Sequence, residues 1–144
     1  YSGEALMNEA VQKRGSVETA YFSVTGTDDE VVPFVNENNW RTNAFFCAWT
    51  AYQTMNGMEV SSRPDFSKDA TFGIALKDRE VISTNKRVTM EAGVLYKGNI
   101  PLIKVVAVND YGHWNFKPDA RLMWDFMKQF SRDPRTKKLV YGKR

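Results

Sequence analysis

The 144-residue chain is long enough to bury one hydrophobic core, and its 42% hydrophobic and 26% charged residues are ordinary for a globular domain. No apolar run approaches the roughly 18 residues that a membrane helix needs. The formal charge of +3 comes with no nucleic-acid-binding motif. We therefore expect neither a membrane nor a nucleic acid among its partners.

The first half of the chain predicts two helices and one strand between them. Residues 4–14 have the pattern of a short helix, and Gly15 is well placed to stop it. Residues 17–25 are β-branched and aromatic with a nearly apolar centre, which favours a strand buried on both faces, as in a parallel sheet. Residues 39–56 predict a second helix, because apolar side chains recur there at three- and four-residue steps. These side chains are Phe45, Trp49, Tyr52 and Met55.

Two hairpins are predicted in the middle of the chain. Residues 71–76 and 80–84 form the arms of the first, around a short polar turn. Residues 87–96 and 101–108 form the second, and Gly98 lies where the turn between them needs a glycine. The last arm is rich in valine and isoleucine, so we expect it to be a well-buried strand.

The last predicted element is an amphipathic helix. Pro118 suits its first turn, and the helix ends near residues 133–134. Its broad apolar face consists of Ala120, Met123, Trp124, Met127 and Phe130. Trp124 is therefore interpreted as core, like Trp40 and Trp49, and the basic stretch that follows the helix as a solvated tail.

The chain has one histidine, His113, and one cysteine, Cys47. One histidine does not define a metal site and one cysteine forms no internal disulfide, so we predict neither a metal nor a cofactor. Cys47 lies among aromatic residues, which favours a buried thiol over a nucleophile. As a general base, however, a single histidine is sufficient if a carboxylate orients it and a nucleophile lies beside it.

The positions of the acidic residues and of His113 are informative. Asp28 and Asp29 follow the strand predicted over 17–25, and His113 follows the strand predicted over 101–108. In an open α/β sheet, functional groups gather on loops at the carboxyl ends of the strands. The order of acid and then histidine matches the last two members of the Ser, Asp/Glu, His order of α/β-hydrolases.

Three segments resemble parts of α/β-hydrolase esterases. Gly26–Pro33 looks like their Gly-x-x-Asp-x-x-Val-Pro segment, which places Asp29 at the catalytic acid. Asn109–Trp114 resembles their Gly-His segment, which places His113 at the catalytic histidine. The last helix, Arg121–Ser131, is similar to the closing helix of the polyhydroxybutyrate-depolymerase and feruloyl-esterase-like branch. The likeness extends over most of the chain.

The resemblance implies a fold and an activity. Residues 1–144 would be a single domain, the C-terminal portion of an α/β-hydrolase three-layer fold, with few strands flanked by helices, a β-hairpin and an incomplete sheet. The implied activity is that of a serine esterase. Asp29 would hold the imidazole in the right tautomer, and His113 would take a proton from a serine and return it to the leaving alcohol. Trp114 and Tyr111 are the expected contacts of a polymer- or carbohydrate-linked ester, with the alternative that Trp114 covers the base.

The chain departs from the family pattern at the nucleophile. No Gly-x-Ser-x-Gly occurs in these residues, and the glycine-rich stretch that supplies the second oxyanion donor is absent as well. The nucleophile would then come from a missing N-terminal half or from another copy of the chain. The alternative is a complete chain that has lost catalysis. A basic pI and a single cysteine are compatible with export.

Other interpretations stay open at this point. Asp28 competes with Asp29 for the role of the acid, because a shift of one residue in the loop would exchange them. Both aspartates also suit turns, and His113 could cap the last helix. The competing functions are a non-catalytic binding module, with a groove lined by Trp114 and Tyr111, and an oligomerisation unit. A distance of about 2.6–3.2 Å between Asp29 and His113 distinguishes the esterase from both.

Overall fold

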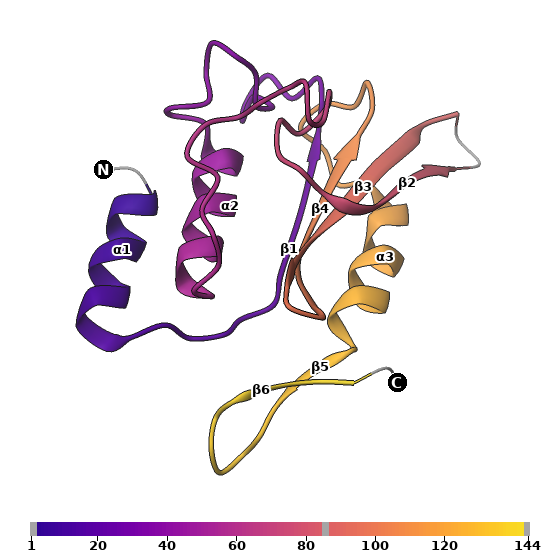
Figure 1. The fold of residues 1–144 in the computed structure, drawn as a ribbon. Coiled ribbons are helices and arrows are strands. Elements are labelled where there is room, and N and C mark those ends of the chain that lie inside the picture. Colours follow the sequence, from indigo (N-terminus) through magenta and orange to yellow (C-terminus); the bar gives the residue numbers. More distant parts are fainter. Residues whose placement is uncertain (1–2, 85–86, 143–144) are drawn as a thin grey trace.

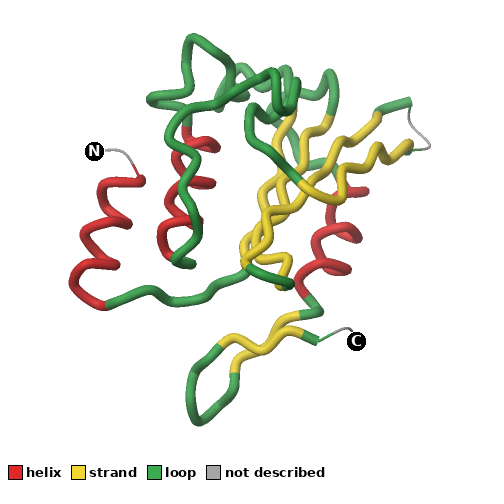
Figure 2. Tube along the Cα trace, viewed as in Figure 1, coloured by secondary structure: helices red, strands yellow, loops and turns green. Residues whose placement is uncertain are grey.

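A computed structural model describes residues 3–84 and 87–142 and shows a mixed α/β fold (Figures 1 and 2). Four strands form a mixed sheet in the order β1-β4-β3-β2, and β5 and β6 form a separate two-stranded hairpin. Helix α2 lies on one side of the sheet with α1 packed beside it, and α3 lies on the other side (Figure 1). The elements are α1 (Gly3–Arg14), β1 (Tyr21–Gly26), α2 (Ala44–Met55), β2 (Lys77–Ser83), β3 (Thr89–Lys97), β4 (Ile100–Val108), α3 (Lys117–Met127), β5 (Phe130–Arg132) and β6 (Leu139–Tyr141).

Strand β1 is covered on both faces, as predicted, and pairs in parallel with β4 over its whole length. Neighbouring side chains of the strand reach opposite layers. Ser23 Oγ accepts a hydrogen bond from Trp49 Nε1 of α2 at 3.1 Å, whereas the ring of Phe22 packs against Phe126 of α3. Because helices cover both sides, the polar Ser23 and Thr25 on one face are buried, and the apolar Phe22 and Val24 on the other face are half-buried.

The strand begins at Tyr21 rather than at Val17, where the sequence pattern placed its start. The backbone before Tyr21 binds the end of α2 instead of a neighbouring strand. The N–H of Val17 donates to the carbonyl of Met55 at 3.0 Å, and the N–H of Thr19 donates to Asn56 Oδ1 at 2.6 Å. A side-chain acceptor at the helix end thus takes the place of a strand partner.

Helix α2 begins at Ala44, several residues later than predicted, because Asn43 caps it. The Oδ1 of Asn43 accepts hydrogen bonds from the N–H groups of Phe45 and Phe46 at 3.1 and 3.0 Å. The C-terminal end agrees with the prediction, since Gly57 follows the helix with a positive φ of 65°.

Of the two predicted hairpins, one is confirmed and one is wrong. Strands β3 and β4 form the hairpin predicted over 87–96 and 101–108, with Gly98 at a φ of 59° in the turn. The arms predicted over 71–76 and 80–84 do not pair with each other, because residues 71–76 form turns. Strand β2 pairs with β3 instead and forms the far edge of the sheet.

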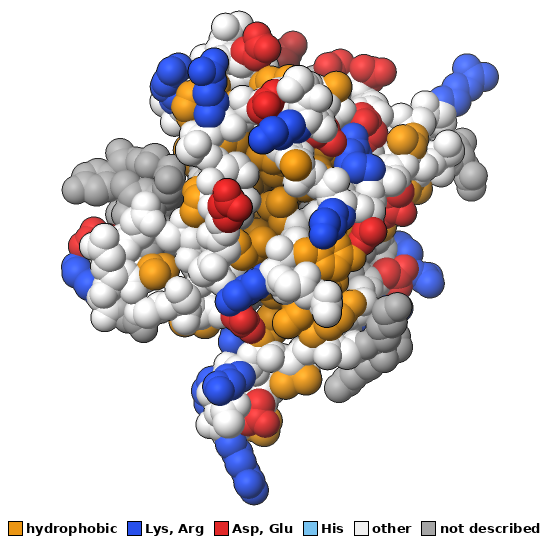
Figure 3. Space-filling view, viewed as in Figure 1, with side chains coloured by type: hydrophobic (Ala, Val, Ile, Leu, Met, Phe, Trp, Pro, Cys, Tyr) orange, Lys and Arg blue, Asp and Glu red, His pale blue; other side chains and the backbone are white. Residues whose placement is uncertain are grey.

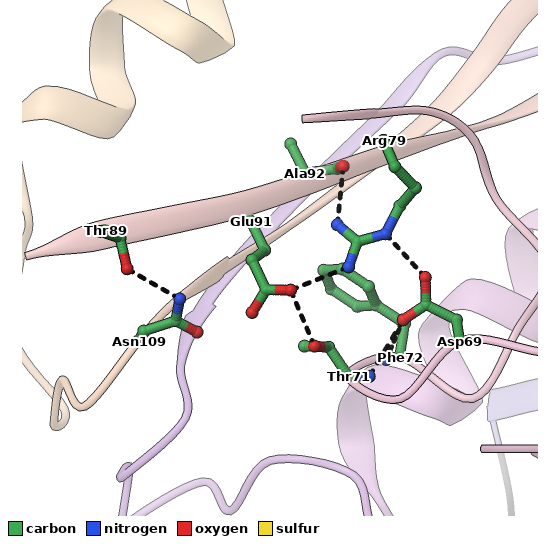
Figure 4. A network of polar contacts seen from close by, with 8 residues as sticks. All are labelled: Asp69, Thr71, Phe72, Arg79, Thr89, Glu91, Ala92 and Asn109. Atoms are coloured by element: carbon green, nitrogen blue, oxygen red, sulfur yellow. Dashed lines mark hydrogen bonds and ion pairs between the residues drawn. The ribbon is translucent and has the colours of Figure 1, made fainter. Parts of the chain in front are cut away.

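Arg79 of β2 anchors the irregular segment before that strand to the sheet (Figure 4). Asp69 Oδ1 accepts hydrogen bonds from the N–H groups of Thr71 and Phe72 at 3.0 and 2.9 Å, while its Oδ2 accepts one from Arg79 Nε at 2.7 Å. The same guanidinium donates to Glu91 and to a carbonyl of β3, both at 2.9 Å, and lies 5.0 Å from the centre of the Phe72 ring. The turn that replaces a predicted strand is therefore held by charge-assisted hydrogen bonds.

Strand β4 separates two hydrophobic cores. Val105 and Ala107 face the core on the side of α2, and Val106 and Val108 face the core on the side of α3. The first core consists of Val35, Phe46, Trp49, Phe72, Ile74, Leu102, Ile103, Val105 and Ala107. The second consists of Met90, Ala92, Val106, Val108 and Phe116. Figure 3 shows apolar side chains reaching the surface between α2 and the sheet, with acidic and basic side chains interspersed around them.

The tryptophans predicted as core differ in their surroundings. Trp49 is 1% exposed and confirms the prediction, and Trp40 is half-buried against the same core. The prediction for Trp124 is wrong, because this side chain is 63% exposed. Helix α3 turns Phe126 and Leu122, four residues apart, toward the sheet. The face that the sequence pattern indicated as buried therefore points outward.

The C-terminal basic stretch is solvent-exposed, as predicted, but it forms a short hairpin rather than an unstructured tail. Phe130 of β5 pairs with Tyr141 of β6, and their ring centres lie 5.3 Å apart. The guanidinium of Arg132 donates to the carbonyl of Glu18 at 2.9 Å and to Thr19 Oγ1 at 3.0 Å. These bonds fasten the hairpin to the segment that precedes β1.

Candidate active site

The loop after β1 holds the carboxylate of Asp29 in one position. Its Oδ1 accepts hydrogen bonds from the N–H groups of Val31 and Val32 at 2.9 and 2.8 Å, which is the side-chain turn that aspartate favours. The Asp29 side chain is only 5% exposed, whereas the neighbouring Asp28 is an exposed residue. One carboxylate oxygen is used within the loop, and the other is available to a residue from elsewhere in the chain.

That residue is His113, on the loop after β4. Its Nδ1 lies 2.8 Å from Asp29 Oδ2, although the two residues are 84 positions apart in the chain. The predicted contact is therefore confirmed, and Asp29 rather than Asp28 makes it. Asp29 also forms a turn, as suggested, because its Oδ1 accepts the backbone hydrogen bonds of the turn while its Oδ2 binds His113. His113 does not cap α3, whose N-cap is Phe116 without a side-chain hydrogen bond.

The surroundings of Asp29 favour its ionised form. Burial alone would raise the pKa of this carboxyl, but hydrogen bonds from the Val32 N–H, from His113 and from the Val31 N–H together hold the pKa below its ordinary value. An ionised carboxylate at Nδ1 favours the imidazole tautomer that carries its proton there, which leaves the Nε2 lone pair available. The His113 side chain is 54% exposed, and its Nε2 makes no hydrogen bond within residues 3–84 and 87–142. This is the arrangement of a general base.

A cavity of about 340 Å³ lies beside the pair, at the carboxyl ends of β1 and β4. Asp29 and His113 both line it, together with the ends of the two strands, the 111–116 loop and the first turn of α3. Its volume lies toward the lower end of the range of small-molecule sites. The two adjacent parallel strands thus bring the acid, the histidine and an open space to one edge of the sheet.

The two predicted substrate contacts both border this cavity, in different ways. Trp114, which follows the histidine, is 83% exposed and has its indole available to a ligand. Tyr111 is half-buried, its ring centre lies 4.9 Å from that of Phe116, and its hydroxyl donates to the carbonyl of Asn115 at 3.4 Å. Tyr111 therefore supports the loop through the second core, and Trp114 is the side chain at the opening.

One charged residue of the cavity was missed from the sequence. Asp119, in the first turn of α3, lines the same space as the pair. Burial raises the pKa of its carboxyl. Its position in the sequence, six residues after His113 and at the start of a predicted helix, could have indicated that it lies near the histidine. An acidic residue in the first turn of a helix is also common for another reason, its favourable interaction with the helix dipole.

The described residues that line the cavity include no serine and no cysteine. Their side-chain hydroxyls belong to Thr25, which is buried and donates to a backbone carbonyl at 3.5 Å, and to Tyr111. Ser23 of β1 faces the opposite layer, where it binds Trp49. Cys47, predicted as buried, is half-buried on α2, outside the cavity lining. The pair thus lacks a nucleophile among the described residues.

Two other kinds of feature are absent from the part of the chain that the structure describes. No group of three or more histidine, cysteine, aspartate or glutamate residues is arranged to hold a metal ion there. None of the helices described has the length and apolar character needed to cross a membrane. No protein-family model, curated protein or solved structure matches the chain.

Proposed function

We propose that this chain is the acid-and-histidine part of a serine esterase of the α/β-hydrolase superfamily, in the polyhydroxybutyrate-depolymerase and feruloyl-esterase-like branch. The observation that carries the proposal is the 2.8 Å contact between Asp29 Oδ2 and His113 Nδ1 beside an open cavity. In the proposal the nucleophile lies outside the described part of this chain, because the described residues that line the cavity include no serine and no cysteine.

The unpaired edge of β1 supports the proposal that the sheet has a further strand from outside the described residues. Within the described part of the chain, β1 pairs with β4 alone, so its other edge has no strand beside it. Yet Ser23 and Thr25 of β1 are 5% and 6% exposed, which is typical of a strand inside a parallel sheet. An unpaired edge of this kind favours the addition of a further strand. In the proposal, the missing N-terminal half or another copy of the chain supplies it.

The geometry defines the steps that these residues would perform. A serine hydroxyl placed against His113 Nε2 gives up its proton to the imidazole as the oxygen attacks an ester carbonyl. Asp29 stabilises the imidazolium that forms and keeps its ring oriented. The imidazolium then protonates the leaving alcohol, and water repeats the sequence on the acyl-enzyme. Oxyanion donors come from the same missing part as the serine.

The cavity lining indicates the kind of ester. Trp114 presents a large, exposed apolar surface next to the base, which suits a sugar or aromatic ring of a polymer- or carbohydrate-linked ester. The lining residues include two carboxylates, Asp29 and Asp119, and no lysine or arginine. A neutral ester therefore fits better than one whose leaving group carries a negative charge.

A second candidate function is a non-catalytic binding module. The absence of a serine or cysteine among the described lining residues, together with the exposed Trp114, favours it. The Asp29–His113 contact counts against it, because a module that binds its ligand through Trp114 needs this bond only as a support for the loop. Binding by a module would survive the replacement of His113, whereas hydrolysis by an esterase would not.

The test uses the product of the complete gene that encodes this chain. We expect a Gly-x-Ser-x-Gly segment upstream of Tyr1, and hydrolysis of p-nitrophenyl acetate and methyl ferulate by the complete protein. Replacing His113 with asparagine should reduce kcat by about 10⁴- to 10⁶-fold while KM changes little. Asp28→Asn is the matched control and should leave kcat within about twofold of the parent. A complete protein without such a serine, or full activity of His113→Asn, would contradict the proposal.

A further inference from the structure

Hydrogen bonds join the loop that carries Asp29 to the loop that carries His113, and they are made by residues that precede these two side chains in the chain. The N–H of Thr27 donates to the carbonyl of Val108 at 3.0 Å, and the N–H of Asp28 donates to the carbonyl of Tyr111 at 3.1 Å. In the opposite direction, the N–H of Asp110 donates to Thr27 Oγ1 at 2.9 Å. Three hydrogen bonds thus join two short segments that lead directly to the acid and to the histidine.

Gly26, the last residue of β1, permits this close approach. A Cβ atom at Gly26 would lie 1.9 Å from the carbonyl oxygen of Tyr111 and 2.9 Å from that of Gly112. Real Cβ atoms essentially never come within 3.0 Å of such an atom, and both neighbours belong to backbone. The φ of Gly26 is not positive, so its backbone conformation does not require a glycine. Glycine is needed here because there is no room for a side chain. Any side chain would push the loop before His113 outward.

Asp110 adds a second constraint on the same loop. It has a φ of 53°, in the left-handed region that residues other than glycine seldom adopt, although aspartate tolerates it better than most. Its N–H is directed at Thr27 Oγ1 in this conformation. The Thr27 hydroxyl therefore helps to hold the turn from which the chain proceeds to His113, three residues later.

We propose that Gly26 and Thr27 are positioning residues, which set the distance between Asp29 and His113 by docking the loop after β1 against the loop after β4. Because Asp29 follows Thr27 by only two residues, we expect a shift between the loops to move the Asp29 carboxylate as well. The hydrogen bond of 2.8 Å would be lost after a separation of about 1 Å, because such bonds weaken beyond about 3.2 Å. The consequence for catalysis rests on the proposed function, whereas the geometric role does not.

The test uses the imidazole itself as the reporter. His113 is the only histidine, so ¹⁵N NMR of histidine-labelled protein observes this one ring and reports which nitrogen carries the proton. The parent chain should show mainly the Nδ1–H tautomer near pH 8, with a slowly exchanging Nδ1 proton. Asp29→Asn supplies the spectrum of the ring without its carboxylate partner, and it retains an oxygen for the Val31 and Val32 N–H groups.

Three variants examine the docking. Thr27→Val removes the hydroxyl at nearly constant volume and should shift the spectrum toward that of Asp29→Asn, with exchange of the Nδ1 proton at least about tenfold faster. Thr27→Ser restores the acceptor and should restore the parent spectrum. Gly26→Ala should give the full change. Circular dichroism shows whether this variant folds, and Thr27→Val carries the test if it does not.

Thr89→Val is the matched control. Thr89 Oγ1 accepts a hydrogen bond from Asn109 Nδ2 at 2.9 Å, on the other side of the same loop (Figure 4). The backbone bond from the Asn109 N–H to the Thr89 carbonyl persists in this variant, so the tautomer should not change. A parent spectrum in Thr27→Val, or an equal change in Thr89→Val, overturns the positioning role.

The same spectra separate this inference from the proposed function. If the parent and Asp29→Asn give identical spectra, the pair is not formed in solution, and both the positioning role and the proposed esterase site fail. If Asp29→Asn changes the spectrum and Thr27→Val does not, the positioning role alone fails. Hydrolysis is not needed for either interpretation, so the sample is the 144-residue chain, once circular dichroism has shown that it is folded.

Discussion

Asp29 and Asp69 make the same local structure at two places in the molecule and bind different partners with it. Each uses Oδ1 to accept hydrogen bonds from the N–H groups two and three residues ahead, and each uses Oδ2 to bind a nitrogen from a distant element. The partner of Asp69 is Arg79 Nε at 2.7 Å, and the partner of Asp29 is His113 Nδ1 at 2.8 Å. The Asp69 and Asp29 side chains are 8% and 5% exposed.

The difference between the two pairs lies in what the partner does with its other nitrogens. The guanidinium of Arg79 is always charged, and it also donates to Glu91 and to a β3 carbonyl over the Phe72 ring (Figure 4). His113 uses one ring nitrogen and presents the other beside a cavity, on a side chain that is 54% exposed. The same turn thus gives a clamp when its partner is a guanidinium, whose nitrogens only donate, and leaves an acceptor nitrogen at the cavity when its partner is an imidazole.

The largest expected effect separates the two aspartates by activity. In the complete protein, Asp29→Asn should lower kcat by about 10⁴-fold, because the asparagine amide favours the wrong imidazole tautomer. Asp69→Asn should leave kcat within about threefold of the parent, since its turn borders no part of the cavity. Steady-state hydrolysis of p-nitrophenyl acetate measures both. Equal losses in the two variants would mean that activity follows general stability rather than the Asp29–His113 pair.

The second expected effect is on stability, and here we expect the Asp69–Arg79 pair to contribute more than the Asp29–His113 pair. Replacing Arg79 with methionine leaves the nearly buried Asp69 carboxylate without its cation, and we expect the free energy of unfolding to fall by about 2–3 kcal/mol. Replacing the more exposed His113 with glutamine should cost less than about 1 kcal/mol. Urea unfolding at pH 7 measures both values. A more costly change at His113 than at Arg79 would reverse the assignment of clamp and base.

The third effect is the acid dependence of stability. Because the folded pKa of Asp29 lies below its unfolded value, its contribution to stability is present above about pH 4 and is lost as the pH falls through the folded pKa. Asp29→Asn should therefore lose less stability than the parent between pH 5 and pH 2.5. The acid limb should not vanish, because the pKa values of Asp65, Asp125 and Asp133 are also lowered. Urea midpoints across this range provide the measurement, and unchanged slopes would contradict the prediction.

The acid–histidine contact was predictable because strong local patterns lead to it. Two apolar strands are plain in the sequence, polar residues follow each of them, and the chain has a single histidine. Parallel pairing of β1 and β4 then places Asp29 and His113 at the same edge of the sheet. Only the resemblance of Gly26–Pro33 to a known segment favoured Asp29 over Asp28. The physical reason, which is the turn that Asp29 makes with Val31 and Val32, could not be read from the sequence.

The clamp and the last helix were not predictable in the same way. Asp69 occurs in a polar stretch, and no local pattern links it to Arg79, which belongs to the strand that displaced a predicted hairpin. Helix α3 has apolar residues on more than one side, and the face that the periodicity indicated as buried was the wrong one. Packing of Phe126 against the sheet decided the orientation of the helix and left Trp124 outside.

The smallest expected effect concerns the aromatic residue beside each pair. Phe72 under Arg79 is fully buried, whereas Trp114 next to His113 is 83% exposed. Trp114→Ala should therefore change the free energy of unfolding by less than about 0.5 kcal/mol. In the complete protein it should raise KM for methyl ferulate severalfold and leave kcat unchanged, because an exposed ring beside the base contributes to binding and takes no part in proton transfer. A drop in kcat with constant KM would show instead that the indole orients His113. Trp114 would then support the imidazole as Phe72 supports the guanidinium of Arg79.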